Sequence, residues 1–499
     1  MQITTFLFAG FVVLAAIGFR CLPKRFRNIW LLFACSVFIL SWSWKFLVVL
    51  LTLVTINYIL GKHAASVRQG KKVLWAGVVI NLLALLFFKY SGFYLPELTS
   101  LLARFGVRTG AGGIQILTPL GLSFITLQMI SYLLDVHYGR IQAEAGFVKF
   151  AVYGLYFPKI LAGPIERPKT FFSRLDSPQK GSLESILQNF TLVLVGLLRK
   201  IVFADSLTAM IPAQAFQQPS LYPASLLAIW LLAYAFALYN DFAGYTSMVR
   251  GISGFFGIEL SRNFNIPYFS RSFSEFWYRW HMSLSSWLRD YIYFPLARWL
   301  RKIIPDPSNV VNLIVPPVLT MLVSGLWHGL GWNTLLWGGL QGTFLVLERV
   351  AGLRGPRIAP AELPRWRQII AAMVVFFCIL MAWVPFHIGV IPAIHYWENL
   401  FSIPNWQISV YTAYLVQKGL GFGFPLGLDH IWALAILPFF QVAFILLPAL
   451  WLDLVQYKGE FSFRKWPSWL QVVLLALAML TLILLSFAEK GAPFIYQSF

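Results

Sequence analysis

Two of the seven histidines in this sequence lie where an imidazole could move a proton. His281 lies in a run of aromatic and polar residues, and His328 lies in a run rich in glycine. An imidazole has an unperturbed pKa of about 6.5, so it can take up and return a proton near neutral pH. The remaining histidines flank apolar segments or lie in predicted loops, where a structural role is commoner: His63, His137, His387, His395 and His430. His281 and His328 are therefore the candidates for proton transfer.

The segment around His281, residues 273–296, has the period of an amphipathic helix. Its apolar residues recur every three or four positions: Phe276, Trp280, Leu284, Trp287 and Tyr291. The opposite side carries Ser274, Tyr278, Ser285 and Arg289. This pattern fits a helix that lies along the cytoplasmic membrane interface. It fits equally well a helix that lines a polar cavity inside a bundle.

The segment around His328, residues 324–342, reads SGLWHGLGWNTLLWGGLQG. Its glycines permit close backbone approach or unusual backbone angles. Close packing of two helices through small residues is the simpler explanation. A ligand or an open passage beside His328 is the alternative. An ionisable group within a membrane segment is a functional candidate in its own right.

The elements that must position these histidines are membrane helices. Hydrophobic residues make up 59% of the 499 residues and charged residues only 12%, against about 25% charged in soluble domains. A soluble enzyme, a disordered protein and a disulfide scaffold are therefore excluded. The stretches with the length and composition of a spanning helix are 4–20, 28–44, 46–61, 73–90, 114–135, 184–203, 223–240, 310–327, 332–349, 368–387, 431–452 and 469–487.

These stretches predict an all-α polytopic helical bundle with about 11 to 13 membrane helices. Because no repeat or long linker divides the chain, we expect a single membrane domain over residues 1–499. We also expect re-entrant or interfacial helices around a central tunnel. The cysteines Cys21, Cys35 and Cys378 show neither metal-ligand nor disulfide spacing.

The net charge of +20 is assigned to cytoplasmic loops that face anionic lipid, and a nucleic-acid partner is not expected. The basic groups that give the orientation are Arg20, Lys24, Arg25 and Arg27; Lys62, Arg68, Lys71 and Lys72; Arg349, Arg354, Arg357, Arg365 and Arg367; and Lys458, Arg464 and Lys465. Placing all of them in the cytoplasm puts both termini and the loop 388–429 outside, and it places His328 away from the cytoplasm.

The apolar stretch 146–163 does not fit this alternation, because basic residues flank it on both sides. We therefore expect a re-entrant or interfacial segment, broken at Gly163-Pro164. Arg199 and Lys200 fall near an outer helix end, where we expect their side chains to extend toward the membrane surface.

Several motifs together resemble the membrane-bound O-acyltransferase family, in its bacterial alginate O-acetylation branch. They are FPKILAGPIERP at 157–168, YNDFAGYTSMVRG at 239–251, NFNIPYFSRSFSEFWYRWHMSLSSWLRDYIYFPL at 263–296, SGLWHG at 324–329 and the ending PFIYQSF. The long motif and SGLWHG, in this order, are a highly specific combination. The chain departs from the family pattern at Ala297-Arg298 and at Lys159-Ile160-Leu161. These departures affect the identity of the acceptor and of the partner protein more than the type of reaction, because neither includes a histidine.

This resemblance implies transfer of an acyl group, most simply acetyl, from a cytoplasmic thioester to a hydroxyl on the outer side. It implies that His328 is the general base and that His281 orients the donor or stabilises developing charge. Asp241, Arg289 and Asp290 are candidate supports, and Trp327 and Trp332 are candidates to shape the passage. A thioester is already activated, so no metal or other cofactor is expected, and the donor is acyl-CoA or an acyl-carrier protein.

The implied setting is the inner (cytoplasmic) membrane, with the lipid bilayer, a polysaccharide acceptor and an extracytoplasmic esterase-like relay protein as partners. The acceptor stays open among alginate, another exopolysaccharide, cellulose, peptidoglycan and teichoic acid. A polytopic transporter or flippase of an envelope precursor is the alternative function. It is disfavoured because the sequence shows no pair of similar halves.

Overall fold

The structure is a computed structural model, and it describes residues 1–65, 70–105, 116–352, 364–407, 414, 428–457, 467, 469, 473 and 476–482. Throughout these residues the regular elements are helices, and no strand occurs among them. The predicted all-α polytopic membrane fold is confirmed.

Seven helical stretches within the described part of the chain are long and apolar enough to cross a membrane. They are Trp44–Ala64, Gly70–Phe88, Leu183–Ala209, Ala224–Phe255, Val310–His328, Arg365–His387 and Leu437–Gln456. Two shorter apolar helices, Phe6–Cys21 and Leu122–His137, match the predicted spans 4–20 and 114–135. The predicted spans 28–44 and 332–349 are also helical, as Lys24–Leu40 and Trp332–Val350.

The described residues group into two compact units, and each is treated by itself. The expectation of one domain over residues 1–499 stays a prediction. The first unit comprises Met1–Val193 and Thr246–Arg262, and the second comprises Leu194–Tyr245 and Asn263–Phe499.

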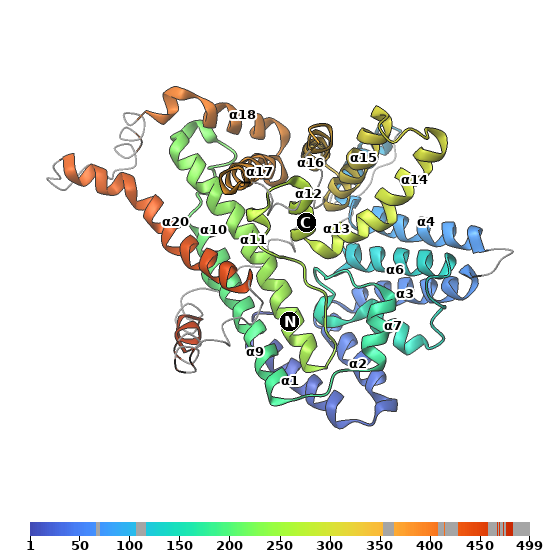
Figure 1. The fold of residues 1–499 in the computed structure, drawn as a ribbon. Coiled ribbons are helices and arrows are strands. Elements are labelled where there is room, and N and C mark those ends of the chain that lie inside the picture. Colours follow the sequence, from blue (N-terminus) through green and yellow to red (C-terminus); the bar gives the residue numbers. More distant parts are fainter. Residues whose placement is uncertain are drawn as a thin grey trace. The chain divides into compact units, whose positions relative to one another are not determined.

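The first unit holds the N-terminal helices (Figure 1). They are α1 (Phe6–Cys21), α2 (Lys24–Leu40), α3 (Trp44–Ala64), α4 (Gly70–Phe88), α5 (Ser91–Arg104), α6 (Leu122–His137), α7 (Phe147–Leu155) and α8 (Pro168–Asp176). It also takes the first part of α9 (Leu183–Leu197) and the last part of α11 (Ala224–Phe255).

The second unit holds the rest of α9 and α11 and the helices that carry both candidate histidines. Its other helices are α10 (Ser206–Ala209), α12 (Phe273–Arg279), α13 (Met282–Leu288), α14 (Phe294–Ile303), α15 (Val310–His328), α16 (Trp332–Val350), α17 (Arg365–His387), α18 (Val390–Phe401) and α20 (Leu428–Tyr457).

The predicted re-entrant stretch 146–163 is not a crossing helix. Its α-helix, α7, has nine residues, about 14 Å at 1.5 Å per residue, which is half the thickness of a hydrocarbon core. A short 3-10 helix at Phe157–Lys159 follows, and Gly163 adopts a φ of +80°. The interruption therefore agrees with the break expected at Gly163-Pro164.

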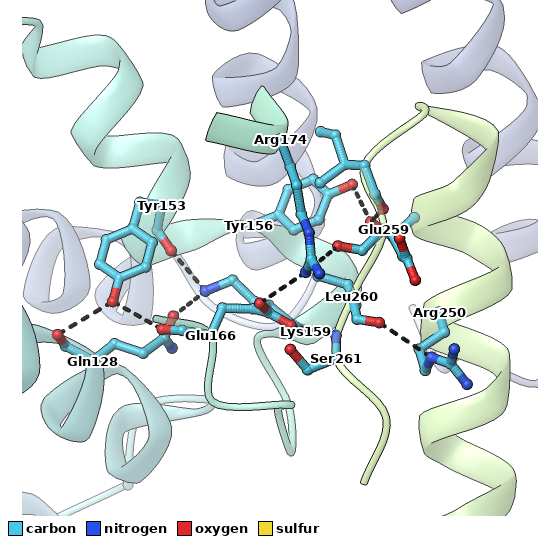
Figure 2. Close-up of polar contacts among 12 residues, drawn as sticks. Gln128, Tyr153, Tyr156, Lys159, Glu166, Arg174, Arg250, Glu259, Leu260 and Ser261 are labelled. Atoms are coloured by element: carbon cyan, nitrogen blue, oxygen red, sulfur yellow. Dashed lines mark hydrogen bonds and ion pairs between the residues drawn. The ribbon is translucent and has the colours of Figure 1, made fainter. Parts of the chain in front are cut away.

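A polar network holds this non-helical segment in the first unit (Figure 2). The Lys159 ammonium donates to the Gln128 side chain and to the Tyr153 carbonyl, the latter at 2.8 Å. The Glu166 carboxylate accepts from the Ser261 backbone N–H at 2.5 Å and pairs with Arg174 at 3.3 Å. Because buried charges are costly unless they are paired and hydrogen-bonded, these contacts fix where the segment lies.

Helices α15 and α16 pack closely in the second unit, and they lie side by side in Figure 1. A Cβ at Gly325 would lie 2.3 Å from the Thr334 carbonyl oxygen. A Cβ at Gly338 would lie 2.5 Å from the Met321 carbonyl oxygen. Close helix packing therefore explains these two glycines of the His328 segment.

Several predictions concern positions outside the described residues. They are Arg68, Arg354, Arg357, Lys458, Arg464, Lys465, the ending PFIYQSF, most of the last predicted span 469–487 and the second half of the loop 388–429. The first half of that loop contains α18.

Candidate functional site

The predicted helix over 273–296 is interrupted at His281, which corrects the expectation of one continuous helix. Helix α12 ends at Arg279, and α13 begins at Met282. His281 lies between them with φ 42° and ψ 52°, in the left-handed region. This conformation is costly for a residue with a Cβ, and such strained residues cluster at functional sites.

The break at His281 is held by a segment that precedes α12. The Asn263 carbonyl accepts from the Met282 N–H at 2.9 Å, and the Asn263 side-chain oxygen accepts from the Ser283 N–H at 3.1 Å. The Asn265 N–H donates to the Arg279 carbonyl at 2.9 Å. These contacts satisfy backbone groups on both sides of the break, as a helix start requires.

The His281 ring is buried among aromatic side chains and is 1% exposed. The ring of Phe242 on α11 lies 4.8 Å from it, and the indole of Trp327 lies 6.3 Å from it, both edge-on. Burial lowers the pKa of His281, which keeps its imidazole uncharged. An uncharged imidazole can donate one hydrogen bond and accept another.

His328 is the last residue of α15, and it is 5% exposed. Three aromatic rings surround its imidazole: Trp327 at 4.9 Å, Trp337 of α16 at 5.3 Å and Phe386 of α17 at 5.3 Å. The C-terminal end of a helix carries partial negative charge, which favours a cation there. This end of α15 would therefore stabilise the imidazolium that forms when His328 accepts a proton.

Trp327 links the two histidines, because its indole contacts both imidazoles. It is 8% exposed. The structure thus brings His281, His328 and Trp327 into one aromatic cluster within the second unit. Trp332 does not join this cluster: it opens α16 and is 79% exposed.

The polar side of the 273–296 segment lines a cavity of about 390 Å³. All four polar-side residues predicted above, Ser274, Tyr278, Ser285 and Arg289, contribute to its wall. The stripe on the other side is packed away, since Phe276, Trp280 and Leu284 are each 1% exposed. This side of the segment therefore lines a cavity, and whether the segment lies along the membrane interface or inside the bundle stays a prediction.

The wall of this cavity comes from α12, α13, α14, α15 and α16 and from the π-helix Arg289–Tyr293 between α13 and α14. Its lining residues are Ser274, Trp277, Tyr278, Met282, Ser285, Ser286, Leu288, Arg289, Tyr293, Phe294, Pro317, Thr320, Met321, Leu345 and Arg349. Arg289 and Arg349 give it positive charge. Arg289 donates to Asp290 at 2.9 Å, and Asp290 is not among the lining residues.

Asp241 lies beside Phe242 on α11 and forms a buried ion pair. Its carboxylate, 0% exposed, accepts from the Lys200 ammonium at 2.8 Å, and Asp205 contacts the same ammonium at 2.8 Å. Asp241 therefore neutralises the buried Lys200 ammonium within the described structure. That Asp241 also contacts the substrate stays a prediction.

Arg199 and Lys200 are buried, which corrects the expectation that they extend toward the membrane surface. Arg199 is 2% exposed and pairs with Asp453 of α20 at 2.5 Å. Lys200 is 1% exposed. Asp453 and Asp241 come from distant helices, so the only sequence signal for these two pairs is that opposite charges occur within apolar spans.

No group of three or more histidine, cysteine, aspartate or glutamate side chains within the described residues could hold a metal ion.

The chain is similar to known membrane-bound acyltransferases. A family model described as the membrane-bound O-acyltransferase family matches residues 141–388. A probable alginate O-acetylase of Pseudomonas aeruginosa is 34% identical over 392 residues, covering 77% of this chain and 72% of the relative. A peptidoglycan O-acetyltransferase of Helicobacter pylori is 31% identical over 412 residues, with coverages of 76% and 74%. A teichoic acid D-alanyltransferase of Streptococcus thermophilus is 29% identical over 290 residues, with coverages of 54% and 69%.

Proposed function

Because the chain belongs to the membrane-bound O-acyltransferase family, we propose that it transfers an acetyl group from a cytoplasmic thioester to a hydroxyl on the outer side of the inner membrane. The acceptor is a cell-surface polysaccharide, or an esterase-like relay protein that passes the group on. Relatives named for alginate and peptidoglycan O-acetylation support an envelope polysaccharide.

The observation that supports this proposal most is the place of His328. It lies at the C-terminal end of α15, enclosed by aromatic rings, on the helix pair that also walls the cavity. Low exposure limits access of water, which would otherwise compete with the acceptor hydroxyl for the acyl group.

His328 acts as the general base in this proposal. The acceptor oxygen attacks the thioester carbonyl carbon while its proton passes to the His328 imidazole. The bond between carbon and sulfur then breaks, and the leaving thiolate takes up the proton. Such proton transfer contributes roughly 10²- to 10⁴-fold to the rate. His281 assists by donating a hydrogen bond to the donor or to the oxyanion that forms on it.

The cavity is the proposed access for the donor. Thioester donors of both candidate classes, coenzyme A and acyl-carrier protein, carry phosphate on the arm that holds the acyl group. Arg289 and Arg349 line the cavity, and arginine recognises phosphate well because its planar donors match the oxygens. The positive-inside rule places Arg349 toward the cytoplasm, where these donors are found.

The proposal is tested by acyl transfer in vesicles that contain the purified protein. Labelled acetyl thioester is enclosed inside, and a polysaccharide fragment or the relay protein is supplied outside. We expect the label to become covalently attached to the outer acceptor. Uptake or release of label without covalent attachment would instead indicate a transporter.

A further inference from the structure

A set of buried polar atoms between the cavity and His328 has no hydrogen-bond partner. Within the described structure, the Gln341 amide nitrogen and oxygen, the Ser324 hydroxyl and the Trp337 indole nitrogen all lack one. Gln341 and Ser324 are both 0% exposed. Since a buried polar group without a partner is costly, each such group needs an explanation.

Neighbouring polar residues on the same helices are satisfied. The Thr320 hydroxyl donates to the Pro316 carbonyl at 2.6 Å, and the Thr343 hydroxyl donates to the Gly339 carbonyl at 2.8 Å. Ser324 and Gln341 make no comparable bond within the described residues. The polar groups of Ser324 and Gln341 are therefore available to a ligand, although a helix carbonyl could have accepted a hydrogen bond from the serine hydroxyl.

The side chains of Ser324, Trp337 and Gln341 lie on the same side of the α15–α16 helix pair. The two helices run antiparallel, and they touch at Gly325 and Gly338. In an antiparallel pair, the residues just before the contact positions turn toward one common side. Ser324 precedes Gly325, and Trp337 precedes Gly338; Gln341 is one turn beyond Trp337 on the same face. That side faces α12, since the Trp337 indole lies 5.9 Å from that of Trp277.

The same side leads from the cavity to His328. On α16, Leu345 lines the cavity, and Gln341 and Trp337 follow at steps of one turn. The ring of Trp337 then contacts that of His328 at 5.3 Å. A group that moved from the cavity to His328 along this side of α16 would therefore pass Gln341.

We propose that Gln341, assisted by Ser324, binds an amide of the arm that carries the thioester, and so positions the acyl carbonyl at His328. This inference rests on the proposed function. A secondary amide offers one N–H donor and one carbonyl acceptor, which can pair with the carbonyl oxygen and the NH2 group of the Gln341 side chain, whereas the acetyl group offers no donor. In the pantetheine arm shared by both donor classes, the thioester sulfur and two methylene groups separate the acyl carbonyl carbon from the nitrogen of the first amide. That separation matches one helical turn, about 5.4 Å, between the levels of Gln341 and Trp337.

The test compares two small donors with the purified full-length protein in vesicles. S-acetyl-N-acetylcysteamine carries the thioester and the first amide, and S-ethyl thioacetate carries the thioester alone. Thiol release in the presence of an alginate or peptidoglycan oligosaccharide gives kcat/KM for each donor. We expect the wild-type protein to prefer the amide donor by about tenfold or more.

Gln341→Met should remove this preference. Its kcat/KM for the amide donor should fall about tenfold, and that for the amide-free donor should be unchanged. Its thermal stability should be unchanged or higher, because the substitution removes a buried polar group without a partner. Ser324→Ala should lower the preference more weakly. Thr343→Val, on the exposed side of the same helix, is the matched control and should change nothing.

The inference is overturned if Gln341→Met keeps the wild-type preference, or if it loses activity with both donors equally. A misfolded Gln341→Met protein would also contradict it, since the structure gives this side chain no protein partner to lose; Ser324→Ala then still measures whether the preference falls. If the wild-type protein releases thiol from neither donor, the proposed function fails instead.

Discussion

The ion pair of Lys200 with Asp241 should contribute to the stability of the folded protein. The Lys200 ammonium lies 2.8 Å from Asp241 and 2.8 Å from Asp205, and the Asp241 carboxylate is fully buried. Lys200→Met keeps the length of the side chain but removes the cation. It leaves the Asp241 carboxylate buried without its partner ammonium, which costs roughly 3 to 5 kcal/mol in comparable cases.

The expected change in melting temperature follows from chain length. Unfolding entropy is about 2.1 cal/mol/K per residue, or about 1 kcal/mol/K for 499 residues. Lys200→Met should therefore lower the Tm by about 3 to 5 °C. Thermal unfolding of the purified protein, followed by tryptophan fluorescence, measures this shift.

Two further variants make the result specific. Lys200→Met combined with Asp241→Asn removes cation and anion together and should recover most of the lost stability. Glu398→Gln breaks an exposed ion pair with His395. The side chain of His395 is 60% exposed and that of Glu398 is 63% exposed, so this variant should change the Tm little. A Lys200→Met protein as stable as the wild type would refute the conclusion that Lys200 stabilises the buried Asp241 carboxylate.

Three other predictions concern packing, catalysis and topology. Gly338→Ala should reduce folded yield, because its Cβ would lie 2.5 Å from the Met321 carbonyl oxygen, whereas Gly339→Ala, with no atom within 4 Å, should be tolerated; yield and Tm measure both. His281→Ala should raise KM for the donor as well as lower kcat, and a variant altered in neither would exclude its proposed contact with the donor. A single cysteine at residue 354 should react with an impermeant reagent only after the cells are opened, and labelling in intact cells would contradict the orientation.

The sequence predicted those features that depend on local pattern. Apolar runs of spanning length located the helices, and the period of residues 273–296 separated the buried side from the side that lines the cavity. Residue type and context drew attention to His281 and His328, and the structure brings both imidazoles against Trp327.

The features that escaped prediction depend on contacts between distant segments. The left-handed conformation of His281 is supported by Asn263, through bonds that no periodicity encodes. The burial of Arg199 depends on Asp453, which is 254 residues away in the chain. That the buried Gln341 amide has no hydrogen-bond partner can be recognised only when the atoms around it are known.

We propose that His328 is the general base of an acyl transfer. Its most direct test is the rate of acyl transfer per folded molecule for His328→Ala, with a thioester donor on one side of reconstituted vesicles and the acceptor or relay protein on the other. We expect a rate lower by about 10² or more, in a protein whose yield and Tm stay close to those of the wild type. A folded His328→Ala protein with undiminished specific activity would contradict it.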